Sequence, residues 1–345
     1  MAIIIGLIKI IIVFGIIVGM HEGAHFLMAK KNKIYVKEFA IGFGPKIFSK
    51  EKNGTVYSIR AIPFGGFNDL AENIPDEEAE KNKIEGCQYY KNASAKVRFI
   101  ILIAGVAVNI LFAVLLYFTI HLFSDNRTLV VDTVGNEYQA YGIVQSDDEI
   151  IGIDGKKLRV RSDLDNYLLF NDPDKVTLTI IRDGVEENVE VPVSITNESG
   201  IPRKLIGVTM KYGEKTLKGQ IYYSFWSTIN FVTRTLYGYG TLITGRASIN
   251  NFSGPVGIGE TVATSKGIYE MCYYLSAISI SLGIINLLPI PGLDGGKILF
   301  LIIELIRGKK VNEDVETILS LLCIFLLLMF ALYITKNDIS GMIVK

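Results

Sequence analysis

The chain has 345 residues, of which half are apolar, and its 35 Lys and Arg residues balance its 35 Asp and Glu residues. Without a basic excess, nucleic acid is not expected as a partner. The length would allow two or three domains. The apolar residues are concentrated in four blocks, which is typical of a membrane protein rather than of one large soluble core. These blocks are Ala2–Met20, Phe99–Phe123, Met271–Ile306 and Ile318–Ile334.

A metal-binding motif, HEGAH, continues the first apolar block. His21 and His25 are four residues apart, so a helix places both imidazoles on one face, where they can ligate one metal ion. Glu22 lies about 100° further round the helix and has the spacing of a general base. Ionisable groups are costly inside a membrane span and point to function there. We therefore expect a zinc site on a first transmembrane helix at residues 1–28.

A β-hairpin is expected in the segment 29–97. Two strand-like runs, Phe43–Lys50 and Thr55–Ile62, flank the pair Asn53-Gly54, which is a strong signal for a two-residue turn. The second run leads into Gly65-Gly66, where the backbone can approach another group closely. An ordinary cytoplasmic hairpin is the alternative. Residues 74–83 change from acidic to basic and are expected to be solvated.

A second transmembrane helix is expected at residues 98–123. Gly105 and its small neighbours permit close helix packing, and Asn109 needs a hydrogen-bond partner in lipid. A structural role is the favoured interpretation of both.

The segment 124–200 has a different character. Short β-branched runs alternate with Asp-Gly turns, and Ser162–Phe170 has the pattern of a helix. This pattern predicts one α+β domain of ordinary size. Residues 201–270 are interpreted as a linker with an amphipathic, aromatic-rich helix over Gln220–Gly245, which favours the membrane interface. Packing of this helix against the spans is the alternative.

The third apolar block, at residues 271–306, is too long for one simple crossing. The sequence NLLPIPGLDGG interrupts it with two prolines and three glycines. Broken backbone at membrane depth is tolerated only where protein buries it or where it lines a watery cavity. Asp294 lies in this break, and we assign it as the third zinc ligand. A fourth transmembrane helix is expected at residues 316–335.

Topology is predicted from Lys and Arg in the short loops. The loop from Lys30 to Arg98 holds thirteen of them, and Arg307, Lys309 and Lys310 lie between the third and fourth spans. Both loops are therefore expected in the cytoplasm. The α+β domain is then expected outside, with His21 and His25 at the cytoplasmic end of their span.

These motifs together resemble the site-2 protease family of intramembrane metalloproteases, in its regulator-of-sigma branch with a single PDZ domain. The resemblance rests on HEGAH, on the run from Pro63 to Phe67, on GPVGI at residues 254–258 and on NLLPIPGLDGG. It implies zinc ligation by His21, His25 and Asp294, with Glu22 as general base. It also implies that Asn286 holds the substrate backbone, and that Gly65, Gly66 and Phe67 belong to a membrane-re-entrant hairpin that offers an edge to the substrate.

Some positions depart from the family pattern. Val106 stands where the family usually has proline, and Ser146-Asp147 stands where the PDZ pattern has Gly-Asp before the strand beginning at Glu149. The loop that would hold a peptide carboxylate is not recognisable near Val131–Gly135. These departures weaken the expectation that the domain captures a C-terminus, and they leave the metal site untouched.

The sequence therefore predicts a polytopic α-helical membrane protein with about four transmembrane helices, one of them broken, a membrane-associated β-hairpin and one extracytoplasmic PDZ-like domain. We expect an intramembrane zinc metalloprotease with one Zn²⁺ per chain, in a bacterial inner (cytoplasmic) membrane. Expected partners are the lipid bilayer, single-pass membrane substrates such as anti-sigma factors or signal-peptide remnants, and an upstream site-1 type protease. A catalytically inactive scaffold and a zinc-handling transporter are the alternatives.

Overall fold

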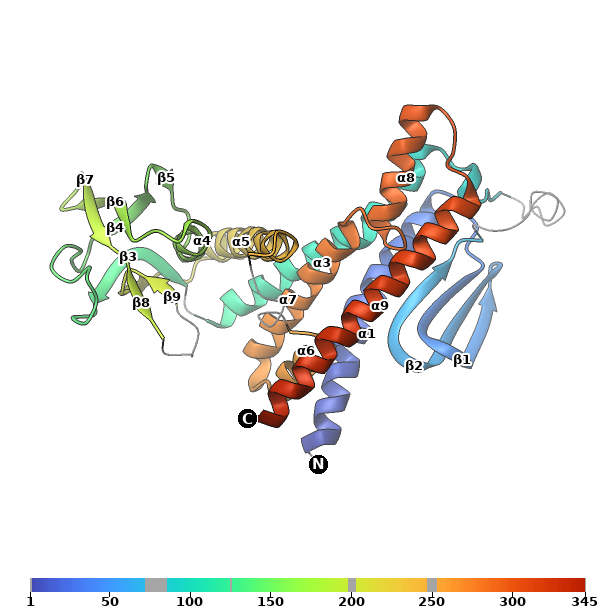
Figure 1. The fold of residues 1–345 in the computed structure, drawn as a ribbon, viewed down its shortest axis with the longest axis horizontal. Coiled ribbons are helices and arrows are strands. Elements are labelled where there is room, and N and C mark those ends of the chain that lie inside the picture. Colours follow the sequence, from blue (N-terminus) through green and yellow to red (C-terminus); the bar gives the residue numbers. More distant parts are fainter. Residues whose placement is uncertain (1, 72–85, 125, 198–202, 247–252, 345) are drawn as a thin grey trace. The chain divides into compact units, whose positions relative to one another are not determined.

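The computed structural model describes residues 2–71, 86–124, 126–197, 203–246 and 253–344. The chain divides into two compact units, one formed by Met1–Ala113 with Thr241–Lys345 and the other by Val114–Gly240 (Figure 1). The stretch 74–83, expected to be solvated, lies outside the described residues.

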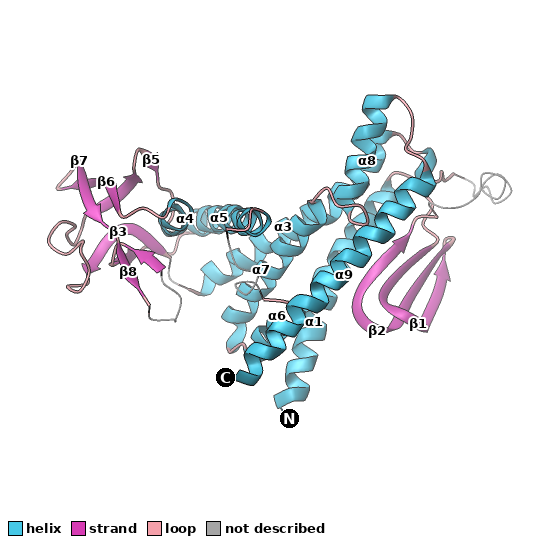
Figure 2. Ribbon diagram, viewed as in Figure 1, coloured by secondary structure: helices cyan, strands magenta, loops and turns pink. Residues whose placement is uncertain are grey.

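Long apolar helices make up most of the first unit (Figure 2). Among the described residues, four helices are long and apolar enough to cross a membrane, which confirms the number predicted. The second and the fourth extend beyond their predicted spans, the first is described from Ala2 to Lys31, and the third ends at the predicted break. They are α1 (Ala2–Lys31), α3 (Ala95–Phe123), α7 (Gly267–Leu287) and α9 (Glu313–Val344).

The third apolar block breaks where the prolines and glycines predict. Helix α7 ends at Leu287, and α8 (Asp294–Arg307) begins at the predicted zinc ligand. One further helix, α6 (Pro255–Thr264), was not predicted, and it packs against α1 and α9. The carboxylate of Asp338 on α9 accepts hydrogen bonds from the backbone N–H groups of Gly254 and Gly257 at the start of α6. These N–H groups have no partner within their own helix, so Asp338 replaces the missing cap.

The predicted hairpin forms β1 (Glu38–Lys52) and β2 (Thr55–Asp69). Asn53 and Gly54 at its tip have φ of 52° and 69°, as a two-residue turn of this kind requires. Both strands bend, so the start of β1 lies between the first and the last part of β2 and pairs with both. Ala40, for example, opposes Ser58 on one side and Phe67 on the other. The bend brings the final part of β2 against α1, which carries the zinc motif.

A mixed α+β domain makes up most of the second unit. Its main sheet has the order β10-β3-β4-β6-β7, with β5 beside β4, and every pairing is antiparallel. Helix α4 (Arg161–Asn171) contributes Leu164 and Leu168 to a buried core with Ile150, Ile180 and Met210. The strands are β3 (Arg127–Val134), β4 (Glu149–Ile153), β5 (Lys156–Lys157), β6 (Lys175–Arg182), β7 (Val185–Pro192), β8 (Ser194–Thr196), β9 (Arg203–Leu205) and β10 (Val208–Tyr212).

The predicted domain boundary at residue 200 is wrong. Strand β10 lies beyond it and pairs with β3, with Val208 opposite Val134 and Met210 opposite Val131. Its polar residues, Thr209 and Lys211, alternate with apolar ones, but this pattern covers only five residues and is too short to be recognised in the sequence. The domain therefore extends from Arg127 to Tyr212, and Gly213 N–H donates to the Asn126 carbonyl at 2.8 Å where its two ends meet.

The Gly-Asp pattern before β4 also needs correction, because it falls one residue later than the sequence suggested. Asp147 has φ of +74°, a left-handed conformation that favours glycine and that Asp tolerates. Asp148 has 1% relative exposure and accepts bonds at 2.8 Å from the Gln145 N–H and from the Arg182 guanidinium. Asp147 thus has the backbone conformation that suits the Gly of a Gly-Asp pair, and Asp148, in the place of the Asp, carries the buried carboxylate.

Helix α5 (Leu217–Ile243) confirms the predicted amphipathic helix, and its polar face is the buried one. Ser224 and Thr228 are each only 1% exposed, whereas Ile221 is 56% and Phe225 is 47% exposed. The polar face packs on the α+β domain, where the Asn230 amide donates to Ser162 and Asp163 at the start of α4. The apolar face is left outward, as expected for a helix whose outer neighbour is lipid.

Candidate metal centre

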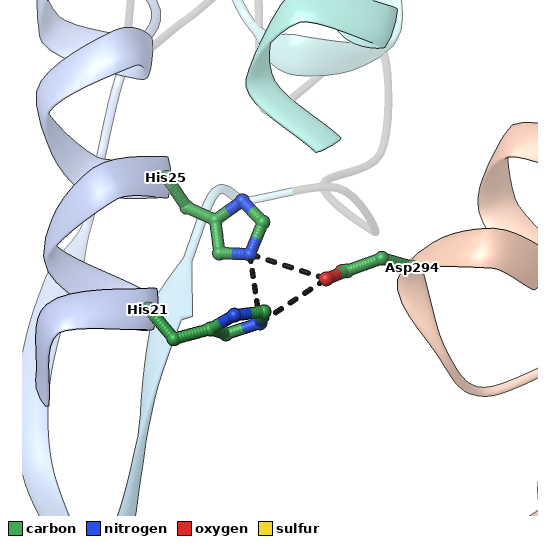
Figure 3. A group of neighbouring side chains, drawn as sticks. All are labelled: His21, His25 and Asp294. Atoms are coloured by element: carbon green, nitrogen blue, oxygen red, sulfur yellow. Dashed lines mark hydrogen bonds and ion pairs between the residues drawn. The ribbon is translucent and has the colours of Figure 1, made fainter. Parts of the chain in front are cut away.

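Helix α1 and the first turn of α8 bring His21, His25 and Asp294 together (Figure 3). The two imidazole Nε2 atoms lie 3.2 Å apart, and Asp294 Oδ2 lies 3.2 Å from Nε2 of His21 and 3.3 Å from Nε2 of His25. Both histidines are buried, at 4% and 7% relative exposure. Residues 269 positions apart thus form a nearly equilateral triangle of possible ligand atoms.

This triangle fits a tetrahedral zinc ion. With zinc–ligand bonds of about 2.0–2.1 Å, two ligand atoms of a tetrahedron lie about 3.3 Å apart, which is the side observed. Asp294 Oδ2 is buried and, within the described residues, meets no donor at hydrogen-bonding geometry although both imidazoles are close. Three ligand atoms that face a common centre explain this, since none then points directly at another. Two nitrogens and one oxygen are a typical ligand set for catalytic zinc.

Each histidine has a second partner that orients its ring. His25 Nδ1 lies 2.7 Å from the Ile101 carbonyl on α3, so Nδ1 carries the proton and Nε2 is free to ligate. His21 Nδ1 lies 3.3 Å from the Asn109 amide, on the same helix. Asn109 Oδ1 has no partner among the described residues. Rotating the amide by 180° exchanges Nδ2 and Oδ1, so that Oδ1 accepts the proton on His21 Nδ1. Both rings are then held for ligation through Nε2.

The glycines after Asp294 allow the broken segment to fold tightly over the start of α8. A Cβ on Gly295 would lie 2.2 Å from the Leu288 carbonyl oxygen, and one on Gly296 would lie 2.3 Å from that of Ile290. Only glycine fits at both positions, because the nearby atoms belong to the backbone. This packing sets where the first turn of α8, and therefore Asp294, lies.

Asn286, in the last turn of α7, lies beside the triangle. Its Nδ2 atom is 3.1 Å from His21 Nε2, the ring atom that faces the centre. An amide in this place can contact a substrate bound at the remaining zinc position. The structure thus brings Asn286 together with the three predicted ligands.

The hairpin reaches Glu22 through two residues of β2. A Cβ on Gly66 would lie 3.4 Å from Glu22 Cγ, and the Asn68 amide donates to the Glu22 carboxylate at 2.7 Å. Gly65 instead lies against the Phe43 ring, and the Phe67 ring lies under the Arg60 guanidinium at 4.9 Å. Of the three predicted hairpin residues, Gly66 is the one placed next to the base.

Two residues near the centre were not among the predicted site residues. Asn109 was noted only as a polar residue needing a partner in lipid, and that requirement was the signal that could have identified it. Asn68 gave no signal, because an asparagine near the end of a strand is ordinary in a sequence. Its partner, Glu22, becomes a neighbour only through the bend of the hairpin.

Comparison with known proteins agrees with this geometry. The sequence profile of peptidase family M50 matches residues 9–330. The zinc metalloprotease RasP of Geobacillus kaustophilus is 30% identical, covering 97% of each chain, and the regulator of sigma-W protease RasP of Bacillus subtilis is 29% identical, covering 96% of this chain and 98% of that one. A relative from Fusobacterium nucleatum is 34% identical over 342 residues, covering 95% of this chain and 97% of that protein.

The fold and the matching profile define a membrane-embedded zinc metalloprotease. The chain belongs to peptidase family M50, the site-2 proteases. Among solved structures, the PDZ domain of an SdrC-like protein from Listeria monocytogenes is 19% identical and covers 25% of this chain and 90% of that one, with a TM-score of 0.21.

Proposed function

We propose that this enzyme cleaves single-pass membrane proteins within their transmembrane segments, with zinc held by His21, His25 and Asp294 and with Glu22 as general base. The observation that carries the proposal is the triangle of ligand atoms with sides of 3.2, 3.2 and 3.3 Å, formed inside a bundle of membrane-spanning helices. A soluble metalloprotease would not need helices of this length and apolar character.

Bound zinc would supply an open coordination position and would polarise the peptide carbonyl. Glu22 accepts the proton of the attacking water and then donates it to the leaving amine as the peptide bond breaks. Asn286 holds the substrate backbone beside His21. The substrate helix must unwind first, because its amides are otherwise hidden in its own hydrogen bonds.

Replacing Glu22 by Gln tests this function directly. Co-expressed with a trimmed single-pass substrate, the intact enzyme should cleave it, and E22Q should lose at least about 100-fold in rate while retaining zinc. H21A and D294A should lose zinc as well as activity. Cleavage by E22Q at the normal rate would reject Glu22 as the base, and zinc retained by both ligand variants would reject the metal site.

The hairpin edge formed by Gly65, Gly66 and Phe67 is proposed to receive the unwound substrate by strand addition. In support, the described pairings leave the outer edge of residues 66–69 without a partner strand, and Gly66 adjoins Glu22. A photo-crosslinking amino acid at Phe67 should capture substrate on illumination. The same group at Phe48, on the far part of the hairpin, should not, and equal capture at both positions would reject strand addition.

The proposed topology places the loop 29–97 and the metal centre near the cytoplasm and the PDZ-like domain outside. The charge asymmetry of the loops supports it. Cys87 is an exposed native cysteine in the loop, and Cys272 and Cys323 are less accessible. A membrane-impermeant maleimide should label Cys87 only in opened cells. In the variant D183C, which places a cysteine in the β6–β7 turn, the same reagent should label that cysteine in intact cells. The reverse pattern would invert the topology.

The RasP of Bacillus subtilis is named as a regulator of sigma-W protease. We propose by this relationship that the substrates include anti-sigma factors or signal-peptide remnants in a bacterial inner membrane, and that an upstream site-1 type protease trims them first. The PDZ-like domain would exclude untrimmed substrates. The exposed apolar side of α5 supports a lipid-facing position beside that domain.

A further inference from the structure

Asn68 holds the side chain of Glu22 by two hydrogen bonds from a single amide group. Its Nδ2 atom donates to Glu22 Oε2 at 2.7 Å and to the Glu22 backbone carbonyl at 2.8 Å. An amide NH₂ has two hydrogens, so both are used on one residue. The orientation of the amide is fixed, because turning it over would place Oδ1 against two acceptors.

The position of Asn68 is set by the tight docking of its strand. Asn68 opposes Phe39 in the pairing of β2 with β1. Two residues earlier, a Cβ on Gly66 would lie 2.7 Å from the Ala40 carbonyl oxygen, so any other residue there would push the strand away. The same Cβ would lie 3.4 Å from Glu22 Cγ on α1, so this part of β2 fits closely against both β1 and α1, and the amide of Asn68 reaches the carboxylate directly.

This arrangement has a cost that a purely structural side chain would avoid. Asn68 Oδ1 is buried and has no hydrogen-bond partner among the described residues. A buried polar atom without a partner lowers stability, and an apolar residue of the same size would remove that cost. The two bonds to Glu22 are what the asparagine contributes in return.

We propose that Asn68 is a positioning residue for catalysis, which aligns the Glu22 carboxylate for proton transfer. This inference rests on the proposed role of Glu22 as base. A glutamate has several rotatable bonds, and a misplacement of about 1 Å can cost a catalytic group about 100-fold in rate. With Oε2 engaged by Asn68, Oε1 is the oxygen left for the attacking water. Asn68 acts through Glu22, because both hydrogen bonds that its amide donates within the described residues go to Glu22 and none to a predicted zinc ligand.

Two variants of the full-length enzyme test this. N68L removes both donors at similar size, and N68D places an oxygen against the two Glu22 oxygens. Each should bind zinc at one ion per chain and keep KM for a single-pass substrate within about threefold, while kcat falls about 100-fold. Because both variants are checked for zinc content and for thermal unfolding, a folding defect is distinguished from a catalytic one. Asn53→Asp, the matched change at the hairpin tip, should leave kcat unchanged.

A second measurement asks whether Asn68 acts through Glu22. The shorter carboxylate of E22D cannot make the same contact, so adding N68L to E22D should lower kcat no further. The proposal is overturned if kcat of N68L stays within threefold of the parent value, or if N68L raises KM and keeps kcat. It is also overturned if the kcat losses of N68L and E22D multiply in the double variant. Normal cleavage by E22Q would instead overturn the proposed function itself, whatever Asn68 does.

Discussion

Gly105 on α3 faces His25 on α1 so closely that a Cβ at Gly105 would lie 2.4 Å from His25 Nε2 and 2.6 Å from His21 Cε1. Helix α3 therefore forms the wall behind the metal ligands. Gly105→Ala should displace the imidazoles, lower zinc affinity at least about tenfold and lower cleavage with it. Zinc content after dialysis against a graded chelator measures the change.

The motif supplies a matched control for this change. A Cβ on Gly23, between the two histidines in sequence, would meet no atom within 4 Å. Gly23→Ala should therefore keep full zinc affinity, and it should favour the helix slightly because alanine has the higher helix propensity. Equal zinc loss in the two variants would show that steric contact with the rings is not the cause.

Asn109 provides a second test of the metal centre. If Asn109 Oδ1 accepts the His21 Nδ1 proton, then Asn109→Leu should weaken zinc binding about 10- to 100-fold. Asn109→Asp keeps an acceptor and should retain binding. Zinc affinity by chelator competition separates the two outcomes. A loss in Asn109→Asp as large as that in Asn109→Leu would show that the amide instead acts as a donor.

The sequence predicted much of the site because its ligands lie in local patterns. His21, Glu22 and His25 lie within five residues of one helix, and Asp294 lies at the end of the Pro- and Gly-rich break, in the first turn of α8. Lys9 shows the limit of such patterns. It is the one charge in the first apolar block, and its Nζ donates to the carbonyls of Ala263 and Ser265. Partners more than 250 residues away leave no local signal.

The same limit applies to the hairpin and to the end of the α+β domain. The Asn53-Gly54 turn was recognisable, but the bend that places Asn68 on Glu22 depends on tertiary pairing. Strand β10 pairs with β3, and Val208 lies opposite Val134, which is 74 residues earlier in the chain. Its alternating pattern covers only five residues, so the pairing with β3 is what defines it as a strand.

Asp148 makes the stability of the α+β domain depend on pH. Burial raises the pKa of its carboxyl, but bonds from Arg182 and from the Gln145 N–H lower it more, so the pKa lies below its usual value. The ionised group therefore stabilises the fold above the unfolded pKa of about 3.9, and this is lost as pH falls through the folded value. Asp148→Asn should cost about 2 kcal/mol at pH 7 and progressively less below about pH 4.

Hydrogen exchange of the amides of Ile150 and Ile180, whose residues pair across β4 and β6, measures this cost in the full chain. Protection at pH 7 should fall in Asp148→Asn relative to the parent. Asp165→Asn, on the exposed face of α4, is the matched control and should change protection little, because a surface ion pair contributes at most about 1 kcal/mol. A constant difference between Asp148→Asn and the parent from pH 7 to pH 3 would contradict the assignment.

Removal of the α+β domain tests whether it excludes untrimmed substrates, as proposed. Strand β10 belongs to its sheet, so the deletion must include Arg127–Tyr212, because a shorter one would leave an unpaired edge prone to aggregation. The bond between Gly213 N–H and the Asn126 carbonyl shows that the ends meet, so two or three glycines can rejoin them. The shortened enzyme should cleave an untrimmed substrate that the parent leaves intact, and Glu22→Gln in the same background should abolish this. Unchanged selectivity, with trimmed substrate still cleaved, would instead assign the domain a passive role.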